Sequence, residues 1–112
     1  MSTKYTVTIN NNNYPFIQAG SGTISSTVVD NCADTSFNFN STFANTPSVV
    51  ISFYPPTTAK YTVMPTYSIR SINTSSCEFY SATKDCDYGG TKSDPVPPGT
   101  TFYWIAIDYT VS

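Results

Sequence analysis

Hydrophobic and polar residues alternate along short stretches of this chain, separated by turn-forming residues. Near the start, Tyr5, Val7 and Ile9 alternate with threonines, which is the period-two pattern of a strand. We expect the asparagines at 10–13 and then Pro15 to end this strand, because Asn and Pro favour turns. The chain is therefore predicted to open with a short strand.

Two further strands are predicted before residue 45. Residues 23–29, which follow Gly20-Ser21-Gly22, are rich in Ser, Thr and Val, and such residues suit a pleated surface. Phe37, Phe39 and Phe43 then fall on alternate positions, with polar residues opposite them. This spacing predicts a third strand with all three phenylalanines facing the core.

The middle of the chain predicts a central strand followed by shorter ones. Residues 49–53 form a nearly continuous apolar run between prolines, as in a buried sandwich strand. Strands are also predicted at 67–73 and 77–83, while 61–64 fit either a short strand or a loop. Residues 84–99 contain two adjacent glycines and three prolines, so we expect a long polar loop there.

The last predicted strand, residues 101–111, is apolar on both faces. One face carries Tyr103, Ile105, Ile107, Tyr109 and Val111, and the other carries Phe102, Trp104 and Ala106. Such a strand is expected to lie centrally in its sheet, with the core on one side. In a chain of 112 residues, the natural cover for the other side is a neighbouring subunit.

Composition agrees with an all-β fold. The chain has no leucine, and its nine tyrosines and seven phenylalanines accompany many β-branched residues, which favour strands over helices. No internal repeat, linker or long helical pattern is present, so we expect one antiparallel β-sandwich or small barrel. Its length suits a single core.

Charge excludes several classes of partner. Only 11% of residues are charged, the net charge is −2, and the five Lys and Arg residues are scattered, whereas nucleic-acid binding requires clustered cations. No apolar run approaches the roughly 20 residues that cross a bilayer, so we expect no membrane insertion. The first residues contain no apolar leader segment, which leaves a cytoplasmic location open. Two glycosylation sequons, at Asn40 and Asn73, favour an extracellular or cell-surface location.

Several chemistries lack the residues they need. There is no histidine, the usual base of hydrolytic triads, and the three cysteines have no Cys-x-x-Cys spacing, so a zinc site is not expected. Asp85, Asp87 and Asp94 contain carboxylates that glycoside hydrolysis would need in pairs, but solvated loop acids are the simpler interpretation. We therefore expect no enzymatic activity, no metal and no cofactor.

The order of motifs resembles the H-type lectin family over residues 18–111. The motifs are an opening strand at 18–24, Phe43, the Pro47-to-Phe53 strand, Tyr67-Ser68-Ile69-Arg70, the Ile72-to-Phe79 segment containing Asn73-Thr74-Ser75, and the closing Tyr103-to-Tyr109 strand with Trp104-Ile105-Ala106-Ile107. The resemblance implies a six- to seven-stranded antiparallel sandwich that assembles as a homotrimer. It also implies metal-free binding of galactose or N-acetylgalactosamine between subunits.

The resemblance also suggests site residues. The family's aspartate after the opening strand corresponds to Asp30 or Asp34, and its arginine would be Arg70 if the register shifts by one strand repeat. The family's aromatic–histidine pair falls near Asp87 and Tyr88, in a chain without histidine. These five residues are the predicted sugar contacts.

Cysteine pairing and the first residues leave alternatives open. The family's usual disulfide would pair Cys32 with Cys86, whereas a bridge between Cys77 and Cys86 would hold the long loop against its strand. Residues 1–17 precede the lectin-like domain, residues 18–112. They are expected to add a further strand to the sandwich, the alternative being pairing with another subunit.

Two functions follow as hypotheses. The first is a secreted or cell-surface lectin that binds galactosides through several weak sites on one trimer, so that avidity compensates for shallow sites. The alternative is a structural trimeric module of a fibre or surface array that binds no sugar, which the missing histidine and displaced arginine favour.

Overall fold

The structure, a computed structural model, describes residues 3–54, 63–85 and 93–110. Within these residues it contains strands and no helix. The strands are β1 (Thr3–Ile9), β2 (Asn12–Thr23), β3 (Val28–Val29), β4 (Cys32–Asn38), β5 (Ser48–Phe53), β6 (Val63–Ile72), β7 (Ser76–Asp85), β8 (Ser93–Pro95) and β9 (Thr101–Ile107).

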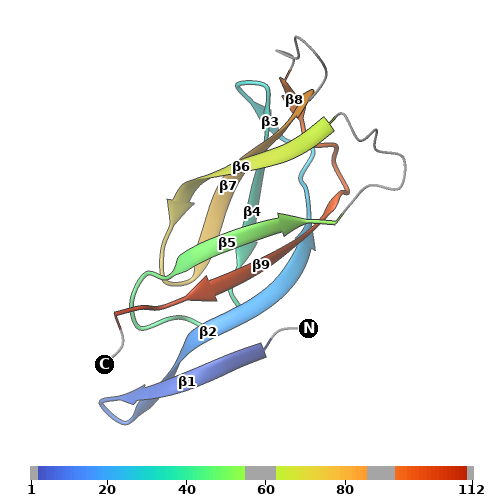
Figure 1. Cartoon of the computed structure of the whole chain (residues 1–112). Helices are drawn as coiled ribbons and strands as arrows, with labels where there is room; N and C mark the ends of the chain where they lie inside the picture. Colours follow the sequence, from blue (N-terminus) through green and yellow to red (C-terminus); the bar gives the residue numbers. More distant parts are fainter. Residues whose placement is uncertain (1–2, 55–62, 86–92, 111–112) are drawn as a thin grey trace.

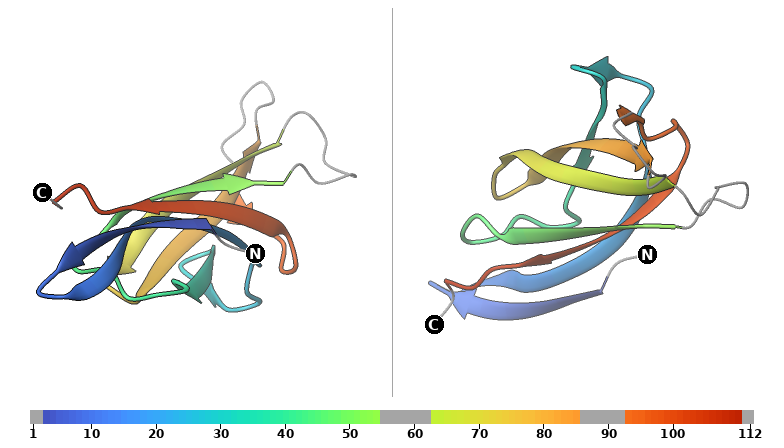
Figure 2. Two further views of the ribbon diagram at one scale, coloured as in Figure 1. Left: turned by 90° about the horizontal axis from the view of Figure 1, so that it is seen from below. Right: turned by 45° about the horizontal axis from the view of Figure 1, so that its top comes forward.

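The strands form two antiparallel sheets packed face to face, which confirms the predicted β-sandwich (Figure 1). One sheet has the order β1-β2-β9-β5, and the other has the order β3-β4-β7-β6, with β8 paired to β7. The two layers are seen separately in Figure 2. Strands β3 and β8 are only two and three residues long, so the longer strands number seven.

The first strand forms a hairpin with the second, at the edge of the four-stranded sheet. Asn10 and Asn11 both have positive φ, at 50° and 65°, which a two-residue hairpin turn requires and Asn tolerates. The prediction that Pro15 ends the strand is wrong. β2 runs through Pro15 because the ladder is irregular there: Thr6 pairs with Pro15 and Tyr5 with Ile17, so a bulge accommodates the missing N–H.

Glycines that resemble a turn lie inside β2 instead. Gly20 pairs with Trp104 and Gly22 with Phe102 on β9. A Cβ on Gly20 would lie 2.6 Å from the Trp104 ring, and one on Gly22 would lie 2.7 Å from the Phe102 ring. These two glycines are therefore required for the aromatic rings to pack over β2. The predicted strand at 23–29 is wrong in its extent, since β2 ends at Thr23 and only Val28–Val29 of that range form a further strand, β3.

Aromatic rings from both sheets make the core. Phe79 on β7 meets Phe102 on β9 edge to face, with ring centroids 5.0 Å apart, and Phe37 stacks on Trp104 at 5.0 Å. The predicted third strand ends earlier than expected, at Asn38. Phe39 and Phe43 are nevertheless buried, because the loop after β4 folds back over the core.

The last strand lies between β2 and β5, as its two apolar faces predict. Phe102, Trp104 and Ala106 are at most 3% exposed, whereas Tyr103 and Ile105 are 45% and 46% exposed. The strand ends at Ile107, earlier than predicted. Tyr109 lies in the following turn, and Val111 is outside the described residues.

The segments around β6 and β7 differ from expectation at their ends. β6 begins at Val63 and continues through Pro65 opposite Thr83. The predicted loop at 84–99 instead begins as the end of β7 and includes β8, while residues 86–92 lie outside the described part. Along one side of the sandwich, the backbone N–H of Ile51 on β5 donates a hydrogen bond to the hydroxyl of Tyr67 on β6, at 3.2 Å.

Two further findings bear on earlier expectations. In the part of the chain that the structure describes, no helix is long and apolar enough to span a membrane. β1 is the edge strand of the same sheet as β2 and β9, and β2 extends across the proposed boundary between residues 1–17 and 18–112. The division into those two segments stays a prediction.

Candidate binding surfaces

The outer face of the β3-β4-β7-β6 sheet carries a strip of charged side chains. Asp34 on β4 lies opposite Tyr80 on β7, and Glu78 lies two residues along β7 on the same face. Both β7 residues alternate with buried Phe79, so they point away from the core. Arg70 on β6 completes this group, which we call the polar strip: Asp34, Arg70, Glu78 and Tyr80.

A β-bulge places Arg70 on the outer face. The ladder between β6 and β7 pairs Ile69 with Phe79 and then Ser71 with Glu78, leaving Arg70 unmatched. Because of the extra residue, Ile69 and Ile72 both pack against the core although three positions separate them. Arg70 is turned outward toward β7, as bulges often redirect a side chain.

Arg70 is held over the ring of Tyr80. Its guanidinium carbon lies 5.2 Å from the ring centroid, within the range of a cation–π contact. A hydrogen bond with Tyr80, together with the charges of Tyr80, Glu78 and Asp30, raises the pKa of Arg70 above its ordinary value. The cation is therefore positioned beside an aromatic ring on an exposed surface.

The two carboxyl groups of the strip share a site. A hydrogen bond with Asp34, desolvation and the charge of Asp34 raise the pKa of Glu78, which Arg70 partly opposes. Like charges that are diagonal neighbours on adjacent strands repel each other. Among the described residues, Oδ1 of Asp34 is buried and has no hydrogen-bond partner.

The structure brings two of the predicted site residues, Asp34 and Arg70, to the same sheet face. A third, Asp30, is close enough for its charge to act on Arg70. Asp34 and Arg70 flank β7 from opposite sides, and Asp30 sits in the turn between β3 and β4 with a positive φ of 51°. Asp87 and Tyr88 lie outside the described residues, so their predicted contacts remain predictions.

Sequence reasoning missed Glu78 and Tyr80 as site residues. The alternation around buried Phe79 was the available signal, because it turns both neighbours to the outer face. Their meeting with Asp34 depends on strand pairing across more than forty positions, which a single sequence does not reveal.

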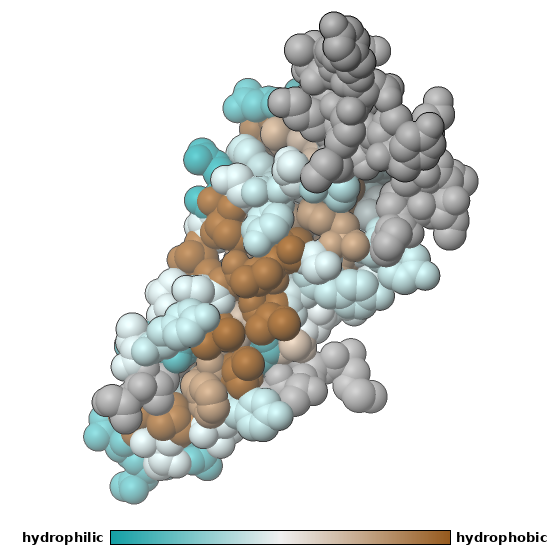
Figure 3. Space-filling model, viewed as in Figure 1, coloured by the Kyte–Doolittle hydropathy of each residue, from teal (hydrophilic) through white to brown (hydrophobic). Residues whose placement is uncertain are grey.

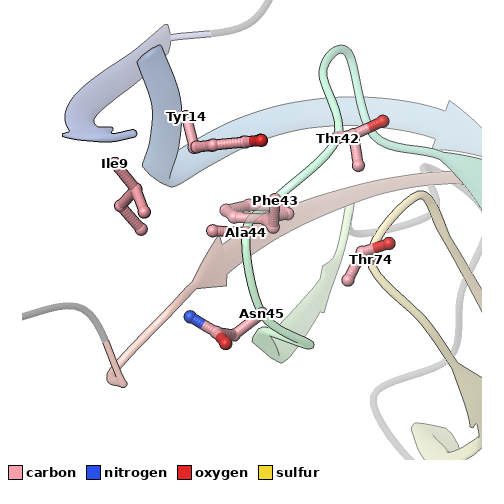
Figure 4. A pocket seen from close by; sticks show the side chains of 7 residues that line it. All are labelled: Ile9, Tyr14, Thr42, Phe43, Ala44, Asn45 and Thr74. Carbon is pink, nitrogen blue, oxygen red and sulfur yellow. The ribbon is translucent and has the colours of Figure 1, made fainter. Parts of the chain in front are cut away.

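A pocket of about 410 Å³ opens at one end of the sandwich (Figure 4). Ile9 and Tyr14 come from the β1–β2 hairpin, and the other walls come from the loop after β4 and the turn after β6. Its lining also includes Thr42, Phe43, Ala44, Asn45 and Thr74. No charged side chain is among these residues, and the Tyr14 side chain projects from β2 across the pocket in Figure 4.

The loop that walls this pocket is held on one side by Gln18. This side chain is fully buried on β2. Its Oε1 accepts hydrogen bonds from the backbone N–H groups of Asn40 and Ser41, at 2.9 and 3.2 Å, and its Nε2 donates to the Ser41 carbonyl at 2.8 Å. One glutamine thus satisfies three backbone groups of a loop more than twenty residues away.

Asp108 holds the other side of the same loop. Its Oδ2 accepts from the backbone N–H and the side-chain Nδ2 of Asn45, at 3.2 and 3.3 Å, and its Oδ1 accepts from the N–H and hydroxyl of Thr110. Burial raises the pKa of Asp108, but the hydrogen bonds from Thr110 and Asn45 outweigh it and hold the pKa below its ordinary value. Backbone N–H groups of Phe39 and Phe43 also donate to the carbonyls of Ser75 and Thr74.

A row of apolar side chains crosses the outer face of the β1-β2-β9-β5 sheet. Val50 on β5 pairs with Ile105 on β9, which pairs with Ala19 on β2, and Val50 is 59% exposed. Tyr103 and Tyr54 lie beside this row with ring centroids 6.5 Å apart. Figure 3 shows the hydrophobic side chains as a band that crosses β5, β9 and β2.

The described cysteines lie outside both the polar strip and the end pocket. Cys32 and Cys77 are free in the structure, and Cys86 lies outside the described residues, so the two predicted pairings remain predictions. Burial, aided by the charge of Glu78, raises the pKa of Cys77 to about 11, which keeps it a thiol at neutral pH. Within the described ranges, no group of three or more His, Cys, Asp and Glu residues could hold a metal ion.

Comparison with family models, with curated proteins and with solved structures gives no match for this chain.

Proposed function

We propose that this protein is a carbohydrate-binding β-sandwich of the galactose or N-acetylgalactosamine type, resembling the H-type lectins, and that it binds sugar without a metal. The observation that carries this proposal is the polar strip, where an arginine, a tyrosine ring and two carboxyls converge on an exposed sheet face. Asp34 and Arg70 in this strip are two of the residues that the lectin resemblance suggested.

The strip offers the groups that a sugar requires. Neighbouring hydroxyls of a pyranose donate to carboxylate oxygens and accept from the fork of an arginine, and hydrogen bonds to charged groups are the stronger ones. The Tyr80 ring supplies flat apolar area beside these groups, as an aromatic ring with a polar tip can. The carboxyl groups of Asp34 and Glu78 provide acceptors beside the donors of Arg70.

Trimeric assembly is the second part of the proposal. A single exposed strip binds sugar weakly, whereas three linked strips gain avidity. The apolar row of Ala19, Ile105 and Val50 supports an assembly in which subunits meet through the outer face of β9. Exposed apolar patches of this kind commonly mark protein–protein contacts. We also propose an extracellular or cell-surface location, where galactosides are presented.

Calorimetric titration with methyl β-galactoside and N-acetylgalactosamine tests the sugar site. We expect millimolar binding at the strip. Arg70→Gln should abolish the strip's share of the heat and Arg70→Lys should weaken it, because lysine lacks the planar fork. Tyr80→Ala should also weaken binding, whereas Tyr109→Ala, at a tyrosine that is 73% exposed outside the strip, should not. Wild-type protein that shows no heat at 20 mM sugar would contradict the proposal.

A structural assembly module that binds no sugar is the second candidate, and the apolar face of β9 specifically favours it. β2, β5 and β9 contain no charged residue, so this sheet suits a permanent contact. Solution mass distinguishes a discrete trimer from a monomer, and the titration above separates a sugar-binding trimer from a purely structural one.

A further inference from the structure

We propose that the end pocket, lined by Tyr14, Thr42, Asn45 and Thr74, is a second binding site that takes one neutral pyranose. The ligand would be a sugar, as in the proposed function, but the pocket shares no residue with the polar strip. The pocket therefore stands or fails separately from the polar strip.

The lining of the pocket matches a neutral ring with hydroxyl groups. Tyr14 offers a ring face and a hydroxyl, Thr42 and Thr74 offer hydroxyls, and Asn45 offers an amide. Ile9 and Ala44 add apolar contact area. Because no charged side chain lines the pocket, a charged ligand would lose hydration without gaining a partner. A neutral sugar has both the apolar ring face and the hydroxyls that these groups satisfy.

The pocket is large enough to hold a sugar ring. Ligand pockets typically measure about 300–1,000 Å³, and this pocket, at about 410 Å³, lies near the small end of that range. The pocket also opens to solvent, so a glycosidic bond could leave in that direction. The site therefore fits a terminal sugar residue whose glycosidic bond points to solvent.

The pocket wall is built in advance of any ligand. Gln18 and Asp108 are buried polar side chains, at 0% and 3% exposure, and burying such groups is costly unless they are hydrogen-bonded. Both direct hydrogen bonds to the loop at 40–45, from opposite sides. A wall fixed in this way loses little freedom on binding, which favours affinity at a small site.

The first experiment locates binding on the full chain. Amide chemical shifts of ¹⁵N-labelled protein are followed during titration with N-acetylgalactosamine and methyl β-galactoside, and with N-acetylneuraminate as the charged comparison. We expect shifts at Thr42, Ala44, Asn45 and Thr74 with at least one neutral sugar and not with the charged one. Absence of shifts at these residues, or equal shifts with N-acetylneuraminate, would overturn the inference.

Variants separate this site from the polar strip. We expect Tyr14→Ala to weaken the pocket response about tenfold, which corresponds to losing one ring contact. Tyr14→Phe, which keeps the ring and removes only the hydroxyl, tests the same contact in a variant that retains the packing. Tyr5→Ala is the matched control, because Tyr5 is a 58% exposed tyrosine on the same hairpin that does not line the pocket.

The two proposals give different patterns in the same titration. Pocket shifts that persist in Arg70→Gln support the second site, whether or not strip binding is lost. Pocket shifts that vanish in Arg70→Gln would overturn it, since they would then be a distant effect of the strip. Shifts confined to residues 68–71 and 78–80 around the strip, with none at 42–45 or at Thr74, would leave the proposed function intact and remove the second site.

Discussion

The two outer faces of the sandwich differ although they cover the same core. In the four-stranded sheet, charge is confined to Lys4 on the edge strand, and β2, β5 and β9 carry none. In the five-stranded sheet, β4, β6, β7 and β8 all carry charged residues. Inward residues set the fold, and the outward residues are free to differ. The difference separates a face suited to protein contact from a face suited to polar ligands.

The largest effect is expected beneath the apolar face, where side chains face inward. Gly20→Val introduces a Cβ that meets the Trp104 ring at 2.6 Å, and overpacking a core typically costs about 1–3 kcal/mol. Urea unfolding should show this loss, whereas Ser21→Val, one position along and facing outward, should change stability by less than about 0.5 kcal/mol. Equal effects at the two positions would contradict the close packing.

A charge on the apolar face tests its role in assembly. We expect Ile105→Lys to weaken self-association about 10- to 100-fold, or by about 1.4–2.7 kcal/mol, because the lysine would be buried at the contact without a partner. Sedimentation should then show monomers at concentrations where the wild type assembles. Ser68→Lys on the opposite, polar face is the matched control and should leave the mass unchanged. If the wild-type protein itself sediments as a monomer, the apolar face has no role in assembly.

Asp108 gives the sandwich an acid-sensitive end. Its pKa is lower when folded, so its stabilising effect is present above the unfolded value of about 3.9 and is lost as the pH falls through the folded value. Asp108→Asn should therefore be less stable than the wild type at pH 7, by about 1 kcal/mol, and this gap should narrow toward pH 2. Thermal unfolding from pH 7 to pH 2 measures this difference in stability. A difference that does not change with pH would show that the charge of the Asp108 carboxylate is not its cause.

On the polar face, the contribution of Glu78 to stability should depend on pH in the opposite direction to that of Asp108. This is the smallest of the expected effects. The pKa of Glu78 is raised in the folded state, so its contribution is favourable below about pH 4.3 and is lost as the pH rises through the folded value. Glu78→Gln should then be at least as stable as the wild type at pH 7, with no such advantage at pH 3. Asp34→Asn should give a similar gain, and the double variant should add little because one repulsion is removed either way.

Most of the fold could be predicted from the sequence because the core follows period-two alternation. The errors occurred where a local signal had another physical cause. Pro15 is tolerated by a bulge, and Gly20-Ser21-Gly22 makes room for rings on β9 rather than a turn. In both cases the explanation lies on a neighbouring strand that is distant in sequence or outside the local pattern, so the residues around the proline or the glycines do not reveal it.

The sites were less predictable than the fold. The lectin resemblance suggested Asp34 and Arg70, whereas Glu78 and Tyr80 lie beside them only through the pairing of β4, β7 and β6. The end pocket gave no signal, because Gln18 and Asp108 act on a loop far away in the chain. Hydrogen bonds from single polar side chains to distant backbone have no periodicity to detect.

The hydrogen bond from the Ile51 N–H to the Tyr67 hydroxyl affects how the edge of the sheet can pair with other molecules at high protein concentration. β5 is an edge strand of its sheet, and an edge with free N–H groups can add strands from other molecules, which leads toward aggregation. The Tyr67 hydroxyl occupies one of those N–H groups from the opposite sheet. This hydrogen bond leaves one N–H group fewer on the β5 edge for pairing with another molecule, and Tyr67→Phe should free that group next to the exposed Val50.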